Sequence, residues 1–342
     1  IAYKADTNVD GTPVLVFNPL SWERSDMVET TVSFADAVPE QIAVYDGDSL
    51  VPSTVTSRDE EKKTATIRFQ ANNLPSVGFK VFNVKSGDGT VETNLSVEEN
   101  ENLFVMENAF LKVEIDKNTG NIAQVYNKKD GNRPVFADGY QGNEIHIYKD
   151  TGGSSYPAWD LVMEEMNADP IAILDDTPEE IEIIENSPEK IVVRVSRSWS
   201  DSTMYQDITM YPDSDRVDVK MHVNWNEDQR LMKISFPFAA ESDHATYEIA
   251  YGALERPTTR DNSIDNAKFE VSGHKWADVT DDSGEFGASI LNDSKYGWDA
   301  IQLKDEDGNV EATRLRLTAL RSPMGAAVRC SGWDPAAYYI DK

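Results

Sequence analysis

The sequence predicts an all-β protein built of two β-sandwiches. Apolar and polar residues alternate with a period of two, turn-forming residues separate the alternating runs, and regular amphipathic helices are hard to find. The clearest run is residues 217–225, in which every odd position is apolar and every even position is polar. Because successive side chains of a strand point to opposite faces, this run predicts a strand with one buried face.

Shorter runs of the same kind predict the remaining strands. They lie at residues 65–69, 112–115, 181–183, 191–195, 234–238 and 315–317. Combinations of glycine with asparagine or aspartate predict the turns between them, at residues 46–47, 118–121, 130–132 and 307–309. Weak helical patterns occur only at residues 38–43 and 159–167, and neither predicts a long helix.

A change in composition predicts the domain boundary. Residues 86–90 are small and polar, and residues 98–102 are acidic and rich in amides. Residues 1–88 then form a small β-sandwich domain of Ig-like size, and residues 89–342 form a large β-sandwich domain. The total of 342 residues agrees with two domains at roughly 150 residues each.

The charge excludes several classes of partner. The chain has 32 basic and 61 acidic residues, which gives a net charge of −29. Such a field repels phosphate backbones and anionic lipids, so neither nucleic acid nor a membrane is an expected partner. No apolar run approaches the ~20 residues of a membrane span. Neutral and cationic ligands remain open.

Two features predict the cellular setting. Cys330 is the single cysteine, so no internal disulfide is possible, which fits a reducing, cytoplasmic location. The sequence begins at Ile1 with neither an initiator methionine nor a signal-like segment. We therefore expect it to be an excised part of a longer chain.

Residues 273–298 hold the densest set of candidate ligand contacts, centred on His274, Lys275 and Trp276. An aromatic face beside hydrogen-bonding groups is what a protein needs to hold a sugar ring. Strand alternation would turn Lys275 into a core at high cost, so we predict a break at Gly273 that leaves this group on a loop. A purely structural cluster is the alternative interpretation.

A second candidate group follows a glycine-rich loop at residues 151–155. Here Trp159 offers a stacking face next to the carboxylate of Asp160. The alternative is a core tryptophan that closes a sandwich edge.

Motifs for catalysis are missing from the sequence. The four histidines form neither His-x-His nor His-Glu-x-x-His, so no metal site is predicted on this chain. Neither a Gly-x-Ser-x-Gly elbow nor a glycine-rich phosphate loop occurs. With 61 acidic residues, a pair of carboxylates chosen by eye carries no information.

An ordered series of motifs runs along almost the whole chain. It comprises VFNPLSWER at 16–24, ENAFLKV at 107–113, AWD at 158–160, YG at 251–252, ERPT at 255–258, the stretch 274–297 and LRSP at 320–323. Together these motifs resemble the C-terminal β-region of glycoside hydrolase family 38, the α-mannosidases, in its bacterial and fungal cytosolic branch. The resemblance implies a small sandwich followed by a large, galactose-mutarotase-like one.

The resemblance also implies a division of labour. The family's aspartate nucleophile and its histidine and aspartate zinc ligands belong to domains that would precede Ile1. The implied chain therefore has no catalytic residue and no cofactor of its own, with zinc expected in the missing catalytic domain. The full-length enzyme would hydrolyse terminal α-mannose residues with retention, through a covalent intermediate.

In this scheme the large β-domain walls the sugar pocket. The substrate-binding residues implied are Trp159, Asp160, His274, Lys275 and Trp276, with roles in stacking, hydroxyl binding and placing a positive charge near the leaving-group subsites. The implied partners are mannose-containing oligosaccharides, through the parent enzyme, and the N-terminal catalytic domain of that enzyme.

Two departures from the family pattern stand out. Residues 324–333 are not the aspartate-rich loop expected there, and the sequence stops at Lys342, where the family continues into further strands. The large sandwich would then expose a strand edge, which favours self-association into a homo-oligomer.

Two other functions fit the same composition. A mutarotase-like sugar epimerase would need a histidine and a carboxylate in one concave cleft, with His146, His222 and His274 as candidates. A carbohydrate-binding or adhesin module built of Ig-like sandwiches is the other.

Overall fold

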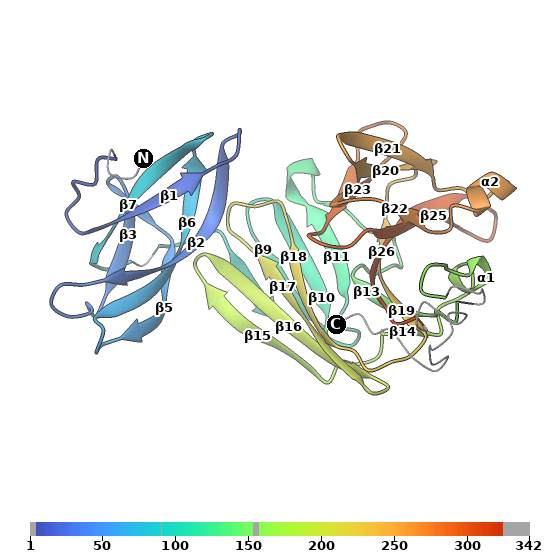
Figure 1. The fold of residues 1–342 in the computed structure, drawn as a ribbon, viewed down its shortest axis with the longest axis horizontal. Coiled ribbons are helices and arrows are strands. Elements are labelled where there is room, and N and C mark those ends of the chain that lie inside the picture. The colour runs from blue at the N-terminus through green and yellow to red at the C-terminus, as the bar shows by residue number, and fades with distance from the viewer. Residues whose placement is uncertain (1–4, 90, 153–156, 324–342) are drawn as a thin grey trace, which may run out of the picture. The chain divides into compact units, whose positions relative to one another are not determined.

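The computed structural model describes residues 5–89, 91–152 and 157–323, and within them the protein is all-β, as predicted (Figure 1). The helices in these residues are short turns: α1 is Met163–Met166, α2 is Ser263–Asn266, and a 3-10 turn covers Lys128–Asp130. Within residues 159–167, only α1 is helical. The weak helix prediction for residues 38–43 was wrong, because β3 begins at Ile42 and buries Ile42 and Ala43 in the core of a sandwich.

The chain folds into two compact units. The first takes in Ile1–Ser96 together with Ile183–Val192 and Thr209–Val217. The second takes in Val97–Glu182, Val193–Ile208 and Asp218–Lys342.

The first unit contains two antiparallel sheets around one core. Phe69 from one sheet and Phe82 from the other lie with their ring centroids 4.9 Å apart and are fully buried. This two-layer packing is a β-sandwich. One sheet has the order β1-β7-β3-β4, with bounds Thr12–Asn18, Gly78–Ser86, Ile42–Asp46 and Ser49–Val51. The other has the order β2-β6-β5, with bounds Arg24–Ser33, Thr64–Leu74 and Ser53–Asp59.

The second unit is built on four sheets (Figure 1). The central six-stranded sheet is β14-β13-β19-β26-β25-β22: Ala172–Ile173, Glu144–Lys149, Arg230–Phe238, Val310–Arg321, Gly297–Lys304 and Val271–Ser272. A four-stranded sheet has the order β15-β16-β17-β18, with bounds Glu180–Ser187, Lys190–Trp199, Ser202–Met210 and Asp218–Asn224. Parts of these strands are counted in the first unit. Another is β21-β20-β23-β24: Gly252–Pro257, His244–Ile249, Trp276–Thr280 and Gly287–Leu291. The five-stranded sheet is β12-β11-β10-β9-β8: Arg133–Pro134, Ile122–Asn127, Leu111–Asp116, Leu103–Glu107 and Ser96–Glu99.

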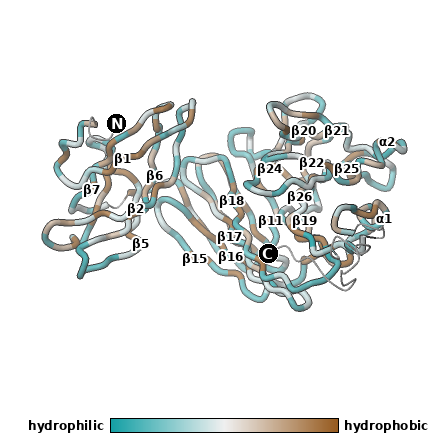
Figure 2. The backbone as a smooth tube through the Cα atoms, in the orientation of Figure 1, coloured by the Kyte–Doolittle hydropathy of each residue, from teal (hydrophilic) through white to brown (hydrophobic). Residues whose placement is uncertain are grey.

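One face of the six-stranded sheet is apolar. Ile145 and Ile147 of β13 and Met232 of β19 pack with Met204 and Trp225 from the strands of the β15–β18 sheet and the segment after it. Apolar and polar stretches alternate along the strands of this part of the chain (Figure 2). Since side chains alternate between faces, the residues between these apolar positions must point to the opposite face.

The predicted turns are present where glycines allow the required backbone. Gly47, Gly120, Gly131 and Gly308 all have positive φ. At Gly120, a Cβ atom would also lie 2.5 Å from the side chain of Val195, so a larger residue there would be strained and crowded. In the described part of the chain, no helix is long and apolar enough to cross a membrane.

Candidate functional site

The second face of the six-stranded sheet carries a network of buried charges. The amine of Lys233 is fully buried and lies 2.6 Å from Oδ2 of Asp299, and it also pairs with the carboxylate of Glu270. Arg316 donates from Nε to the other oxygen of Asp299 at 2.8 Å. The hydroxyl of Thr318 donates to Glu270 at 2.6 Å. We call these five residues the ion network.

Strand register brings the ion network together. Lys233 of β19 lies opposite Thr318 of β26, and Arg316, two residues earlier on β26, lies opposite Asp299 of β25. Residues two apart on a strand share a face, so the side chains from three neighbouring strands meet on one side of the sheet.

The charges of the ion network stabilise one another. Burial by itself would raise the pKa of Asp299, but the positive charges of Arg316 and Lys233 outweigh it and lower that pKa to about 2. Burial would lower the pKa of Lys233, but Asp299 and Glu270 raise it above its usual range. Burial raises the pKa of Glu270, and the amine of Lys233 only partly offsets this. Buried charges are tolerated when they are paired and hydrogen-bonded in this way.

The polar face continues onto β13. Arg316 donates a hydrogen bond to the hydroxyl of Tyr148, and burial raises the pKa of that hydroxyl. Nε2 of His146 lies 3.2 Å from Oε2 of Glu144, yet burial lowers the pKa of His146 more than Glu144 raises it. The imidazole is therefore neutral around pH 7.

The mutarotase-like alternative needs a histidine and a carboxylate that a sugar can reach. His146 has such a carboxylate neighbour but is only 1% exposed. His222 lies on β18, and His274 lies in the loop between β22 and β23. The three candidates thus lie on three different elements, and the one paired with a carboxylate is closed off from solvent.

Acid weakens the ion network in a defined range of pH. The ionised form of Asp299 stabilises the fold above its ordinary pKa of 3.8, and this contribution is lost as the pH falls toward about 2. Urea denaturation at stepped pH should show a fall in unfolding free energy between these values, and Asp299→Asn should flatten it. Glu270, whose pKa is raised, acts at higher pH and with the opposite sign, so the comparison isolates Asp299. Equal slopes in both proteins would contradict this assignment.

The predicted break at Gly273 is present. Strand β22 ends at Ser272 and β23 begins at Trp276, so His274 and Lys275 lie on a loop and Lys275 is exposed. Trp276, which was expected on the same loop, is instead the first residue of β23. The loop passes directly over Trp298, since a Cβ on Gly273 would lie 2.9 Å from that indole ring. Contact this close requires glycine at position 273.

Main-chain hydrogen bonds fix this loop. The N–H of His274 donates to the carbonyl of Glu248 at 2.9 Å, and the N–H of Lys275 donates to the carboxylate of the same residue at 2.7 Å. Asn292 donates from its own N–H to the carbonyl of Lys275 at 2.7 Å. The ring of His274 meets that of Tyr296 edge-on, with centroids 5.9 Å apart. The stretch 273–298 is therefore one locally connected group.

Trp159 and Asp160 lie on a different loop with a different anchor. Arg321 donates to the carbonyl of Asp160 at 3.0 Å and makes a bidentate pair with the buried carboxylate of Asp150. Trp159 is 71% exposed, which excludes its alternative interpretation as a core residue. Tyr156 and residues 153–155 of the glycine-rich loop lie outside the described residues.

The described residues do not fit a zinc site. Across residues 5–89, 91–152 and 157–323, no three histidine, cysteine, aspartate or glutamate side chains gather as metal ligands. Zinc needs at least three such ligands in both structural and catalytic sites. No step of chemistry is assigned to a metal on this part of the chain.

Residues 106–329 match the sequence model of the C-terminal domain of the glycosyl hydrolases of family 38. Alpha-mannosidase G of Dictyostelium discoideum is 32% identical over 272 residues, which are 75% of this chain and 23% of that protein. The alpha-mannosidase of Saccharomyces cerevisiae is 32% identical over 242 residues, which are 67% of this chain and 21% of that protein. The chain thus spans less than a quarter of the length of either relative.

A solved structure shares the fold. A family 38 glycosyl hydrolase from Enterococcus faecalis superposes with a TM-score of 0.71 at 16% identity, over 96% of this chain and 43% of that one. The solved structure shows that the fold is shared, and the family match identifies the chain as a β-region of a glycoside hydrolase. The chain belongs to glycosyl hydrolase family 38 and carries its C-terminal domain, which confirms the resemblance found in the sequence. Residues 324–333, where the sequence departs from the family pattern, lie outside the described residues.

Proposed function

We propose that this chain is the non-catalytic β-region of an α-mannosidase that removes terminal α-mannose residues. The observation that carries the proposal is the match of residues 106–329 to the C-terminal domain of a family whose matched relatives are α-mannosidases. In the parent enzyme the chain would support a separate, zinc-binding catalytic domain in the cytoplasm. Within the chain, residues 1–88 would form a small β-sandwich domain and residues 89–342 a large one.

We propose further that the loop with Trp159 and Asp160 and the segment of residues 274–276 form walls of the sugar pocket. The exposed indole of Trp159 and the partly buried indole of Trp276 would stack on the C–H faces of sugar rings. Asp160 and His274 would bind hydroxyls, and the exposed amine of Lys275 would lie near the leaving group. Main-chain hydrogen bonds hold the backbone of both segments in place, which supports the assignment.

An activity assay tests the proposal. The purified 342-residue chain should release no aryl alcohol from an aryl α-mannoside, with or without added zinc, because the catalytic groups lie elsewhere in the parent. In the full-length enzyme, Trp276→Ala should raise KM for an oligomannoside about tenfold through lost stacking. The exposed Thr280→Ala on the same strand is the matched control. Hydrolysis by the chain alone would refute the non-catalytic role.

A further inference from the structure

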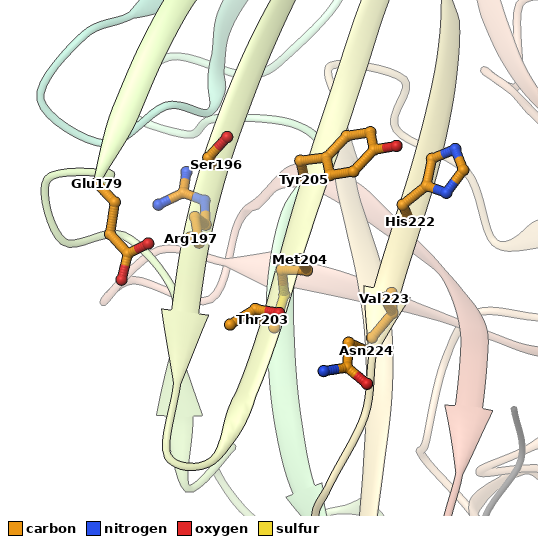
Figure 3. A pocket seen from close by; sticks show the side chains of 9 residues that line it. All are labelled: Glu179, Ser196, Arg197, Thr203, Met204, Tyr205, His222, Val223 and Asn224. Carbon is orange, nitrogen blue, oxygen red and sulfur yellow. The ribbon is translucent and has the colours of Figure 1, made fainter.

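The outer face of the four-stranded sheet is hollowed by a groove that crosses three strands (Figure 3). Its volume is about 380 Å³, and it lies within the second unit. Met204 and Val223, which also belong to the core of this unit, contribute to its lining. Side chains from β16, β17 and β18 and from the segment before β15 form the groove. Its lining includes the polar and aromatic side chains of Ser196, Thr203, Tyr205, His222 and Asn224.

An aromatic plate forms one end of the groove. The rings of Tyr205 and His222 stack with centroids 4.5 Å apart and an angle of 20° between their planes (Figure 3). The guanidinium of Arg194 lies 4.0 Å from the centre of the Tyr205 ring. Asp207 holds that guanidinium by two hydrogen bonds of 2.7 and 2.8 Å. The plate is therefore ordered before any ligand arrives, which lowers the entropic cost of binding.

The polar groups around the plate are free to bind. Within the described part of the chain, the side chains of Ser196, Thr203, Tyr205, His222 and Asn224 have no hydrogen-bond partner. Three hydroxyls, one amide and one imidazole supply donors and acceptors together. A ligand rich in hydroxyls can use both kinds at once.

Two arginines beside the groove, Arg194 and Arg197, are already engaged. Arg194 is neutralised by Asp207, and Arg197 donates to the carbonyl of Asp176 at 3.1 Å and to the side chain of Asn121 at 3.2 Å. With a net charge of −29 in addition, the protein offers an anionic ligand little attraction. These charges favour a neutral ligand.

We infer that this groove is a second carbohydrate-binding site that takes a neutral oligosaccharide of about two rings. Its volume lies within the range of ligand pockets, and its aromatic edge beside unpaired hydroxyl and amide groups suits a sugar. The site lies on β16–β18 and shares no residue with the two segments assigned to the sugar pocket. It does not depend on the proposed function of the parent enzyme.

Titration calorimetry of the purified chain with mannobiose and maltose tests the site. We expect millimolar binding of at least one disaccharide, weakened about tenfold by Tyr205→Ala and by His222→Ala. The control Lys220→Ala changes an exposed residue on the same face of β18, outside the groove, and should bind like the parent chain. Asn224→Ala, which leaves the aromatic plate intact, provides the test if Tyr205→Ala fails to fold.

Three outcomes would overturn the inference. One is that neither disaccharide binds at tens of millimolar. Another is that binding persists unchanged in Tyr205→Ala, His222→Ala and Asn224→Ala. The third is that Trp276→Ala abolishes binding while the groove variants keep it, which would place the sugar on the loop at residues 273–275.

Discussion

Asp299→Ala is expected to lower the free energy of unfolding by about 3–5 kcal/mol. The substitution removes the carboxylate that pairs with both Lys233 and Arg316, and Lys233 is fully buried. Glu270 would then be the one carboxylate of the ion network left to balance the charges of Lys233 and Arg316, in a region closed to water. Urea denaturation followed by tryptophan fluorescence measures the change, because Trp298 lies next to Asp299 in the chain and is buried.

The control for this prediction is Glu306→Ala. It also removes one carboxylate, but from an exposed turn, and should change the unfolding free energy by less than about 0.5 kcal/mol. Similar effects of the two substitutions would show that the ion network contributes nothing beyond ordinary surface charge.

Trp298→Ala is expected to cost about 3–5 kcal/mol as well, for a different reason. This indole is 0% exposed and meets the ring of Tyr247 at 6.4 Å, edge-on, beneath the loop at Gly273. Truncation leaves a cavity. The sheet cannot relax to fill it, because it is held on both sides. Thermal and urea unfolding measure the loss.

A matched substitution separates cavity formation from loss of a tryptophan. Trp22 is 59% exposed, so Trp22→Ala should change stability far less. Trp298→Phe should be milder than alanine, because the indole N–H is buried without a hydrogen-bond partner and its removal costs nothing. A loss below about 1 kcal/mol for Trp298→Ala would contradict the packing argument.

Much of the fold could be predicted because strand and turn signals are local. The run at residues 217–225 became β18, Asp218–Asn224, and the glycines of the predicted turns have the positive φ that those turns require. The break at Gly273 was also predictable, since it was the only way to keep Lys275 out of a core. The boundary between residues 88 and 89 stays a prediction.

The ion network could not be predicted, for two physical reasons. Alternation along Leu315–Leu317 identifies a polar face but does not say whether solvent or another buried layer covers it. The contact between Lys233 and Thr318 also joins residues 85 positions apart, and strand pairing over such distances is not written in any local pattern. The groove on β16–β18 was not predicted either, since the sequence singled out His222 only as a candidate histidine for the epimerase alternative.

The first unit is discontinuous in sequence, and this sets an order of events during synthesis. Within that unit, Arg68 pairs with Glu185, 117 residues later, and Thr54 donates to Glu189 at 2.8 Å. Its last segment is Thr209–Val217. When synthesis has reached Ser96, the two segments that complete this unit, Ile183–Val192 and Thr209–Val217, have therefore still to be made.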